Sequence, residues 1–249
     1  QITFARFSPP CLRWTPMSHS NNPRHVAIIP DGNRRWAKAQ GLAVWRGHER
    51  GVEMFRPIIQ TALKEGIPYL SAWMCSKDNL QKRPKEEVEF LYKVFTRLFQ
   101  ELGGMPELDT HNIRVQAFGE WEAYQPPELV ASIKALEERT KTHDRFFLNL
   151  FDAYDGISEM TRAVSAIAAK GIADVTPADI KAHLYTKDLP PVDLAIRTGG
   201  EPHWSGGFLM WDVANAQMHF SDLMWPDFSA VEFEKVLEEY RSRERRHGK

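Results

Sequence analysis

The sequence predicts a single α/β domain with a mostly parallel central sheet flanked by helices. Three observations lead to this prediction. Short apolar runs of strand length alternate along the chain with longer segments whose apolar residues recur at helical spacing. No internal repeat or low-complexity linker divides the 249 residues. A content of 43% hydrophobic and 11% aromatic residues is typical of a globular enzyme and argues against disorder.

The expected strands are short apolar segments bounded by polar residues, glycine or proline. They cover residues 26–29, 69–74, 113–118, 146–150 and 192–196, and residues 208–213 form a further strand or a buried segment. Because helical segments separate most of these runs, the strands are expected to pair in parallel.

Helices are expected where apolar residues fall on one face of a 3.6-residue repeat. The segment over residues 88–102 is strongly apolar and ends at Gly103 and Gly104. It could line a cavity, although ordinary core packing explains it as well. The other expected helices cover residues 52–63, 129–136 (opened by two prolines), 157–169, 177–183 and 228–245.

Composition and charge exclude several classes of function. A net charge of −1 provides no basic field for nucleic acid. No apolar run approaches the roughly 18 residues of a membrane-spanning helix, and residues 1–16 lack the continuous apolar core of a signal peptide. We therefore expect a cytoplasmic protein. Met17 is typical of a natural start, so residues 1–22 are expected to be a disordered extension and residues 23–249 the folded domain.

The most informative segment is residues 25–36, where an apolar run ends in a carboxylate that a glycine, an amide and two guanidiniums follow. A glycine lets backbone N–H groups approach an anion, and arginines neutralise it. The aspartate can hold a divalent cation on the same phosphate oxygens. An Asp-Gly pair alone also marks an ordinary turn. The predicted phosphate-binding residues are Asp31, Gly32, Asn33, Arg34 and Arg35, and His48 could add a hydrogen bond.

Two further polar segments follow expected strands. In residues 75–84, Ser76, Asn79 and Arg83 could bind a phosphate or a leaving oxygen, although such a segment taken alone is more often a plain polar loop. In residues 193–201 a strand runs into a glycine-rich turn that carries Arg197, which is typical of a second anion pocket or of a tight turn with a surface arginine. Because ligands gather at the carboxyl ends of parallel strands, two pockets on one edge suggest two phosphorylated substrates or one long one.

No Walker, dinucleotide-binding, nucleophile-elbow or zinc-protease motif appears in the sequence. The chain instead resembles the cis-prenyltransferases, the undecaprenyl diphosphate synthase family, from His25 to Gly248. The matching segments follow the family order and are residues 25–38, 47–48, 76–88, 192–201, 223–228 and 243–248.

The resemblance implies a homodimer of α/β subunits with a hydrophobic tunnel beside two diphosphate sites. In this family an allylic diphosphate ionises, an alkene acceptor attacks the cation, and a proton leaves. Asp31 would bind Mg²⁺ as the key catalytic carboxylate, and Ser76 and Asn79 would assist departure of diphosphate or removal of the proton. The substrate-binding positions implied are Gly32, Asn33, Arg34, Arg35, Trp36, His48, Asp78 and Arg83, and, toward the acceptor and the dimer partner, Arg197, His203, Ser205, Arg246 and Gly248.

The chain departs from the family pattern at several positions. Cys75 and Leu80 replace a phenylalanine and a tryptophan, with one residue inserted before Arg83, and Val44 replaces an arginine. Residues 153–157 replace the usual Asn-Tyr-Gly-Gly-Arg. On the acceptor side, His203 replaces an arginine that would form a bidentate fork, and Gln217 replaces a metal-linked glutamate.

These changes suggest that the acceptor is not isopentenyl diphosphate bound in the usual way. The hypothesis favoured is irregular head-to-middle coupling of two allylic diphosphates, the lavandulyl type, with dimethylallyl diphosphate as acceptor and a cyclising variant also possible. The alternative is a regular short- or medium-chain Z-prenyl diphosphate synthase that uses isopentenyl diphosphate. A non-catalytic partner subunit is a minor alternative, since such subunits typically lose the residues that Asp31, Arg34 and Arg35 match.

Overall fold

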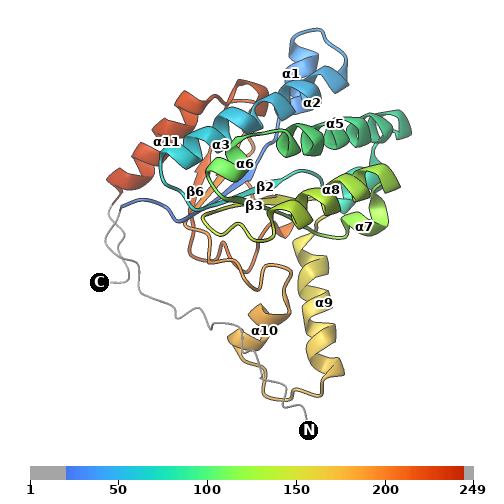
Figure 1. The fold of residues 1–249 in the computed structure, drawn as a ribbon, viewed down its shortest axis with the longest axis vertical. Coiled ribbons are helices and arrows are strands. Elements are labelled where there is room, and N and C mark those ends of the chain that lie inside the picture. The colour runs from blue at the N-terminus through green and yellow to red at the C-terminus, as the bar shows by residue number, and fades with distance from the viewer. Residues whose placement is uncertain (1–20, 244–249) are drawn as a thin grey trace.

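The computed structural model describes residues 21–243 (Figure 1). The expectations for Arg246 and Gly248, and most of the expected N-terminal extension, lie outside these residues. Six strands form one sheet in the order β3-β4-β2-β1-β5-β6, and every neighbouring pair is parallel. The predicted single α/β domain is therefore confirmed. The strands are β1 (His25–Ile29), β2 (Tyr69–Trp73), β3 (Ile113–Phe118), β4 (Phe146–Phe151), β5 (Leu194–Arg197) and β6 (Gln217–Phe220).

Helices connect most of the strands and cover the sheet. Short helices were harder to predict than long ones, because one or two turns carry too few apolar positions to show a repeat. The helices are α1 (Asn33–Ala39), α2 (Val44–Glu53), α3 (Phe55–Lys64), α4 (Lys77–Lys82), α5 (Lys85–Gly103), α6 (Glu107–Thr110), α7 (Trp121–Tyr124), α8 (Pro127–Thr140), α9 (Gly156–Ala169), α10 (Pro177–His183) and α11 (Ala230–Ser242).

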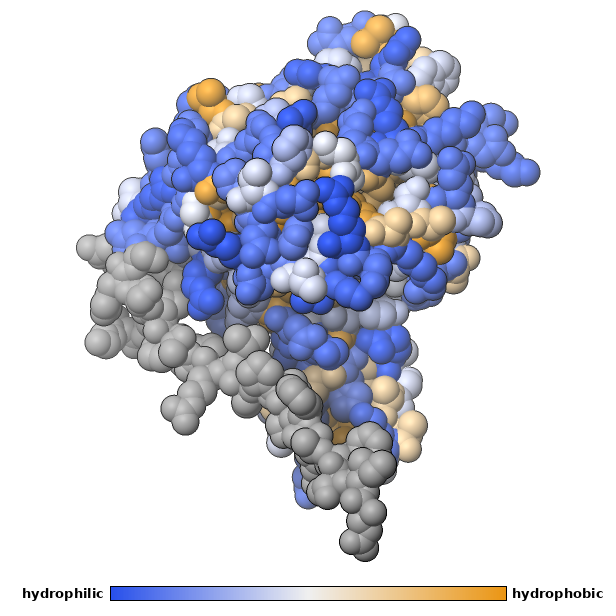
Figure 2. All heavy atoms as spheres, in the orientation of Figure 1, coloured by the Kyte–Doolittle hydropathy of each residue, from blue (hydrophilic) through white to orange (hydrophobic). Residues whose placement is uncertain are grey.

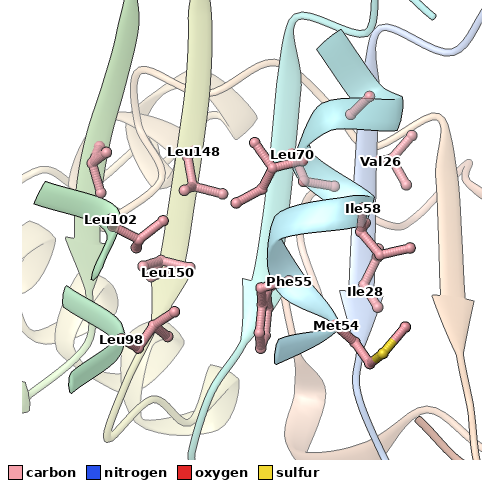
Figure 3. Close-up of a cluster of buried hydrophobic side chains, with 14 of the residues drawn as sticks. Val26, Ile28, Met54, Phe55, Ile58, Leu70, Leu98, Leu102, Leu148 and Leu150 are labelled. Carbon is pink, nitrogen blue, oxygen red and sulfur yellow. The ribbon is translucent and has the colours of Figure 1, made fainter. Parts of the chain in front are cut away.

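The larger core lies on the face of the sheet that α3, α5, α8 and α11 cover. Alternate strand residues point to this face, among them Val26 and Ile28 of β1. Figure 3 shows Phe55 and Ile58 of α3 over β1 and β2, and Leu98 of α5 beside the leucines of β4. The amphipathic repeat of these helices therefore decides which face each one buries.

The opposite face of the sheet carries a smaller core and a row of polar side chains. Ala27 and Ile29 point to this side and pack near Phe151 and Phe208. At its centre His25 Nε2 lies 2.7 Å from Ser71 Oγ, and Asn149 donates to the same hydroxyl over 3.2 Å. Burial lowers the pKa of His25 from 6.5 to about 4. Hydrogen bonds thus join the three side chains, as is usual for buried polar groups, although Asn149 Oδ1 is buried without a partner in the described structure.

The C-terminal third differs from a simple strand pattern at two places. Residues 208–213, expected as a further strand or a buried segment, are a largely buried segment and form no strand. They form consecutive turns, with Met210 N–H donating to Gly207 O and Asp212 N–H to Leu209 O, although Phe208 and Leu209 are buried as expected. Leu209 has φ +51°, which a strand does not allow. The strand missed is β6, whose residues are partly exposed on the edge of the sheet and carry no apolar run.

The surface seen in Figure 2 is mostly hydrophilic, with small apolar patches between charged side chains. This matches a charged fraction of 26%. Within residues 21–243 no helix combines the length and the apolar character needed to cross a membrane.

Candidate active site

A cavity of about 750 Å³ opens at the carboxyl edge of the sheet, where β1, β2 and β5 end and α1, α2 and α5 face one another. This is the point at which the strand order reverses, the position that ligands occupy in open parallel sheets. The charged part of its lining has five arginine or lysine side chains and three carboxylates. The rest is largely apolar, so the cavity suits a molecule with an anionic head and a hydrocarbon tail.

Asp31 lies where the ends of β1 and β5 meet. Its Oδ2 accepts from Arg197 Nη2 (2.9 Å) and faces Arg35 Nη2 (3.3 Å). Its Oδ1 accepts from the Gly32 N–H over 2.6 Å. Gly32 has φ +106°, and a Cβ there would lie 2.6 Å from Met224 Sδ, so only glycine fits this turn. The sequence thus brings a carboxylate and two guanidiniums together through strand register and one glycine.

Arg197 is 5% exposed and organises the loop after β5. Its Nη1 donates to Ser205 Oγ and to the His203 carbonyl, while its Nε is buried without a partner in the described structure. On the outer side Arg35 Nη1 lies 3.1 Å from Glu201 Oε1. Together these contacts make one continuous charged network from β1 to the loop.

A second cationic group lines the other side of the cavity around one carboxylate. Glu87 Oε1 lies 3.4 Å from Arg34 Nε, 3.4 Å from His48 Nε2 and 3.2 Å from Arg83 Nη1. Burial lowers the pKa of His48 to about 4; nearby Arg83 and Arg34 also lower it, while Glu87 opposes the shift. His48 is therefore neutral at pH 7 despite its carboxylate neighbour.

Ser76, Asp78 and Asn79 line the cavity at the start of α4. Ser76 is the N-cap of this helix, and its Oγ accepts from the Asn79 N–H over 3.0 Å. Asp78 pairs with Lys82 one turn later (2.6 Å). This N-cap hydrogen bond fixes the Ser76 hydroxyl at the start of α4.

Among the predicted residues that lie within 21–243, most line this one cavity and two do not. The Trp36 indole N–H donates instead to Asp227 Oδ1 over 2.8 Å. The His203 side chain is 60% exposed, with Nε2 3.0 Å from Ser205 Oγ. The predicted residues that do line it are Asp31, Gly32, Asn33, Arg34, Arg35, His48, Ser76, Asp78, Asn79, Arg83, Arg197 and Ser205.

Sequence reasoning missed most of the apolar wall. For the apolar segment over residues 88–102 the sequence allowed either cavity lining or core packing, and the structure shows both. The N-terminal half of this segment faces the cavity, while Leu98 and Leu102 pack in the core. Trp225 lies in the matching segment 223–228, but nothing in that segment indicated that its side chain reaches the cavity from so far along the chain. The lining residues outside the predicted set include Lys38, Val52, Phe55, Trp73, Met74, Cys75, Leu91, Val94, Phe95, Asp155, Gly206 and Trp225.

Gln217 lies at the far end of its strand from Asp31. It pairs with Leu194, whereas Arg197, which meets Asp31, pairs with Phe220. Gln217 does not line the cavity. Its substitution therefore leaves the charge of this cavity within one chain unchanged, which corrects the expectation that Gln217 alters the acceptor pocket directly.

The donor set fits a hard divalent cation that shares its ligands with a substrate. Within residues 21–243 no three His, Cys, Asp or Glu side chains form a metal-binding group. Asp31, 36% exposed, offers one carboxylate between cations that also attract phosphate. Mg²⁺ is commonly held by one or two carboxylates together with substrate phosphates and water. One aspartate beside an anion pocket is consistent with that pattern.

A family comparison agrees with this geometry. The family model described as putative undecaprenyl diphosphate synthase matches residues 29–248. The chain belongs to the cis-prenyltransferase family. It is therefore a transferase of prenyl groups, and the minor alternative of a non-catalytic subunit is not supported.

Relatives of this cis-prenyltransferase cover nearly its whole length. An isoprenyl transferase from Thermus thermophilus is 40% identical over 237 residues, which cover 91% of this chain and 89% of that protein. A ditrans,polycis-undecaprenyl-diphosphate synthase from Pseudomonas putida, specific for (2E,6E)-farnesyl diphosphate, is 38% identical over 240 residues and 94% of each chain.

Two solved structures share the fold. Lavandulyl diphosphate synthase from Lavandula x intermedia, in complex with dimethylallyl diphosphate, aligns with a TM-score of 0.86 and 33% identity over 92% of this chain and 99% of that one. A probable undecaprenyl diphosphate synthase from Campylobacter jejuni aligns with a TM-score of 0.75 and 28% identity over 92% and 100%. The family thus contains relatives of both the irregular and the regular type.

Proposed function

We propose that this cis-prenyltransferase couples two allylic diphosphates head to middle, with dimethylallyl diphosphate as the acceptor. The observation that carries the proposal is the loop after β5. Its one buried guanidinium, Arg197, already binds Asp31, Ser205 and a backbone carbonyl. His203, in place of a second arginine, is 60% exposed and does not line the cavity. The acceptor side therefore offers fewer free cationic donors than the donor side.

The donor side has the groups that ionisation of an allylic diphosphate needs. Arg34, Arg35 and Arg83 line the cavity there and can neutralise the charge that builds on the departing diphosphate. Asp31 would hold Mg²⁺, which when bound supplies further positive charge to the leaving group. Apolar side chains such as Phe55 and Phe95 exclude water from the carbocation that remains.

The proposed reaction balances without another reactant. The C–O bond of the donor breaks, and diphosphate departs with the electron pair. The C2=C3 electrons of the acceptor then form a bond from C2 to the allylic cation, which leaves the positive charge on C3. A proton lost from a neighbouring methyl group restores a double bond. Ser76 and Asn79 lie beside the donor cations and can bind the departing diphosphate, which can take up this proton.

The alternative is a regular short- or medium-chain Z-prenyl diphosphate synthase that uses isopentenyl diphosphate. One observation favours it: the relatives at 38–40% identity are named as isoprenyl transferases and an undecaprenyl diphosphate synthase. The lavandulyl synthase, at 33% identity, favours the irregular reaction. Both substrates carry the same diphosphate group, so the product decides between them.

Product analysis tests the proposal directly. The protein is incubated with Mg²⁺ and dimethylallyl diphosphate alone, and in parallel with isopentenyl diphosphate added, and products are identified by mass spectrometry after phosphatase treatment. We expect a branched or cyclised C10 alcohol from dimethylallyl diphosphate alone. A product that forms only when isopentenyl diphosphate is added would refute irregular coupling and support the alternative.

We also propose that the enzyme is a homodimer, as the resemblance to its family implies. Exposed apolar side chains on α9 and the loop beside it support an interface, since Ile157, Val164 and Met210 are 64%, 55% and 43% exposed. Light scattering after size-exclusion chromatography tests this, and a monomer at micromolar concentration would contradict it. The cytoplasmic location expected from the sequence stays a prediction for cell fractionation.

A further inference from the structure

Glu87 is a carboxylate just outside the cavity whose partners all line it. It lies in the first turn of α5, and its side chain is 10% exposed. One oxygen, Oε1, is within 3.4 Å of nitrogen atoms of Arg34, His48 and Arg83. These three side chains come from α1, α2 and the end of α4, so Glu87 joins three separate elements of the site.

Each of the three partners contacts Glu87 through only one of its own nitrogen atoms. Arg34 uses Nε and Arg83 uses one Nη, and in the described part of the chain neither guanidinium makes another ion pair or hydrogen bond. A guanidinium has five N–H donors, so most of those on Arg34 and Arg83 remain for a ligand in the cavity. His48 likewise keeps its Nδ1 away from Glu87.

The charges explain why a carboxylate is needed there. Arg34 and Arg83 would repel each other if they were gathered without a counter-ion, and Arg34, at 53% exposure, would otherwise be free to turn into solvent. Ordering a long, free side chain costs up to about 2 kcal/mol of entropy when a ligand binds. Because the carboxylate already holds these side chains in place in the free protein, less entropy is lost when the ligand binds.

We propose that Glu87 is a positioning residue that holds Arg34, Arg83 and His48 in place for the diphosphate of the allylic donor. The inference rests on the proposed function, because it takes diphosphate as the ligand of this side of the cavity. Glu87 itself stays outside the cavity and acts through its three partners. It also sets the His48 tautomer, since a neutral ring that donates to Glu87 carries its proton on Nε2.

Glu87→Gln tests the role of the charge, because it keeps the shape of the side chain. Glu87→Asp keeps the charge and shortens the reach. Glu86→Gln is the matched control, since Glu86 is an exposed acid in the same first turn of α5 and shares its helix-dipole contribution. Affinity for inorganic diphosphate is measured by calorimetry, and the ring nitrogen shifts of His48 by NMR at pH 7.

We expect Glu87→Gln to bind inorganic diphosphate about tenfold more weakly and to lose a similar factor in kcat/KM, with Glu87→Asp intermediate and Glu86→Gln unchanged. The His48 nitrogen shifts should change in Glu87→Gln, and its melting temperature should stay near that of the wild type. A purely structural role would lower the melting temperature without this selective loss of affinity.

Two results would overturn the inference. Equal binding by wild type and Glu87→Gln would mean that the cations need no positioning, and tighter binding would mean that Glu87 only competes with the ligand. If the wild type itself binds no diphosphate, the assignment of this anion site fails as well. The proposed coupling reaction is judged separately, by its products.

Discussion

The substitution Asp31→Asn removes the negative charge between Arg35 and Arg197 while it keeps the size of the side chain. The neutral amide can still accept from the Gly32 N–H, so the turn after β1 is preserved. Arg197 loses its charged partner, and its Nε already lacks a partner in the described structure. The variant therefore isolates the electrostatic role of Asp31 from its role in the turn.

The burial of Asp31 and Arg197 determines how much folding stability the variant is expected to lose. Arg197 is 5% exposed, but Asp31 is 36% exposed and water screens it in part. Breaking a fully buried pair costs about 3–5 kcal/mol, and an exposed pair contributes less than about 1 kcal/mol. We expect an intermediate loss of about 2 kcal/mol, which lowers the melting temperature by about 4–8 °C in a chain of this size. The activity should fall by at least about 10²-fold.

Thermal unfolding by circular dichroism and turnover of dimethylallyl diphosphate with Mg²⁺ measure the two effects. Asp188→Asn is the control, because Asp188 is 81% exposed and, among the described residues, pairs with its neighbour Lys187 alone. It should change neither quantity. If Asp31→Asn melts within about 1 °C of the wild type, the coupling to Arg197 is wrong. If it keeps its turnover, the catalytic role of Asp31 is wrong.

Two further predictions follow from the geometry. Gly206→Ala should impair prenyl transfer, because the backbone there has φ +56° and the new Cβ would lie 2.6 Å from the Trp73 ring. Gly41→Ala is the control and should keep activity, since Gly41 has a similar φ of +66° but nothing within 4 Å of the new Cβ. Equal losses of activity in the two variants would contradict the role of the Trp73 contact. His25 has its pKa lowered to about 4, so the unfolded chain binds more protons and the stability contributed by this group falls as pH drops from 6.5 toward 4. His25→Gln should remove about 1.4 kcal/mol per pH unit from the slope of unfolding free energy between about pH 5 and 6, measured in urea, and an unchanged slope would refute the assignment.

The sheet could be predicted from the sequence because its central strands are buried on both faces. Residues 26–29 are a continuous apolar run, residues 146–150 are apolar except for Asn149, and the structure places both inside the sheet. The edge strand β6 could not be predicted, since Gln217 and His219 are polar and half-buried. For residues 208–213 the sequence could not separate a strand from a buried segment, because burial without a strand produces the same apolar pattern.

The site divides in a similar way. Asp31 and Arg197 each follow a predicted strand, and parallel strands end at one edge, so their meeting could be expected. Glu87 gave no signal, because an acid in the first turn of a helix is ordinary. His203 lies outside the cavity lining, in a loop that continues through Gly206 and Gly207, both at positive φ. No local pattern specifies such a loop.

The sequence by itself determined the alternation of strands and helices, the carboxyl edge as the site and the cationic residues that follow β1, β2 and β5. Burial periodicity and glycine conformations act within short segments, so they can be read locally. Only the tertiary structure decided which apolar side chains form the cavity wall, how Glu87 joins Arg34, His48 and Arg83, and that Gln217 lies away from Asp31. These contacts join residues far apart in the chain, and packing alone brings them together.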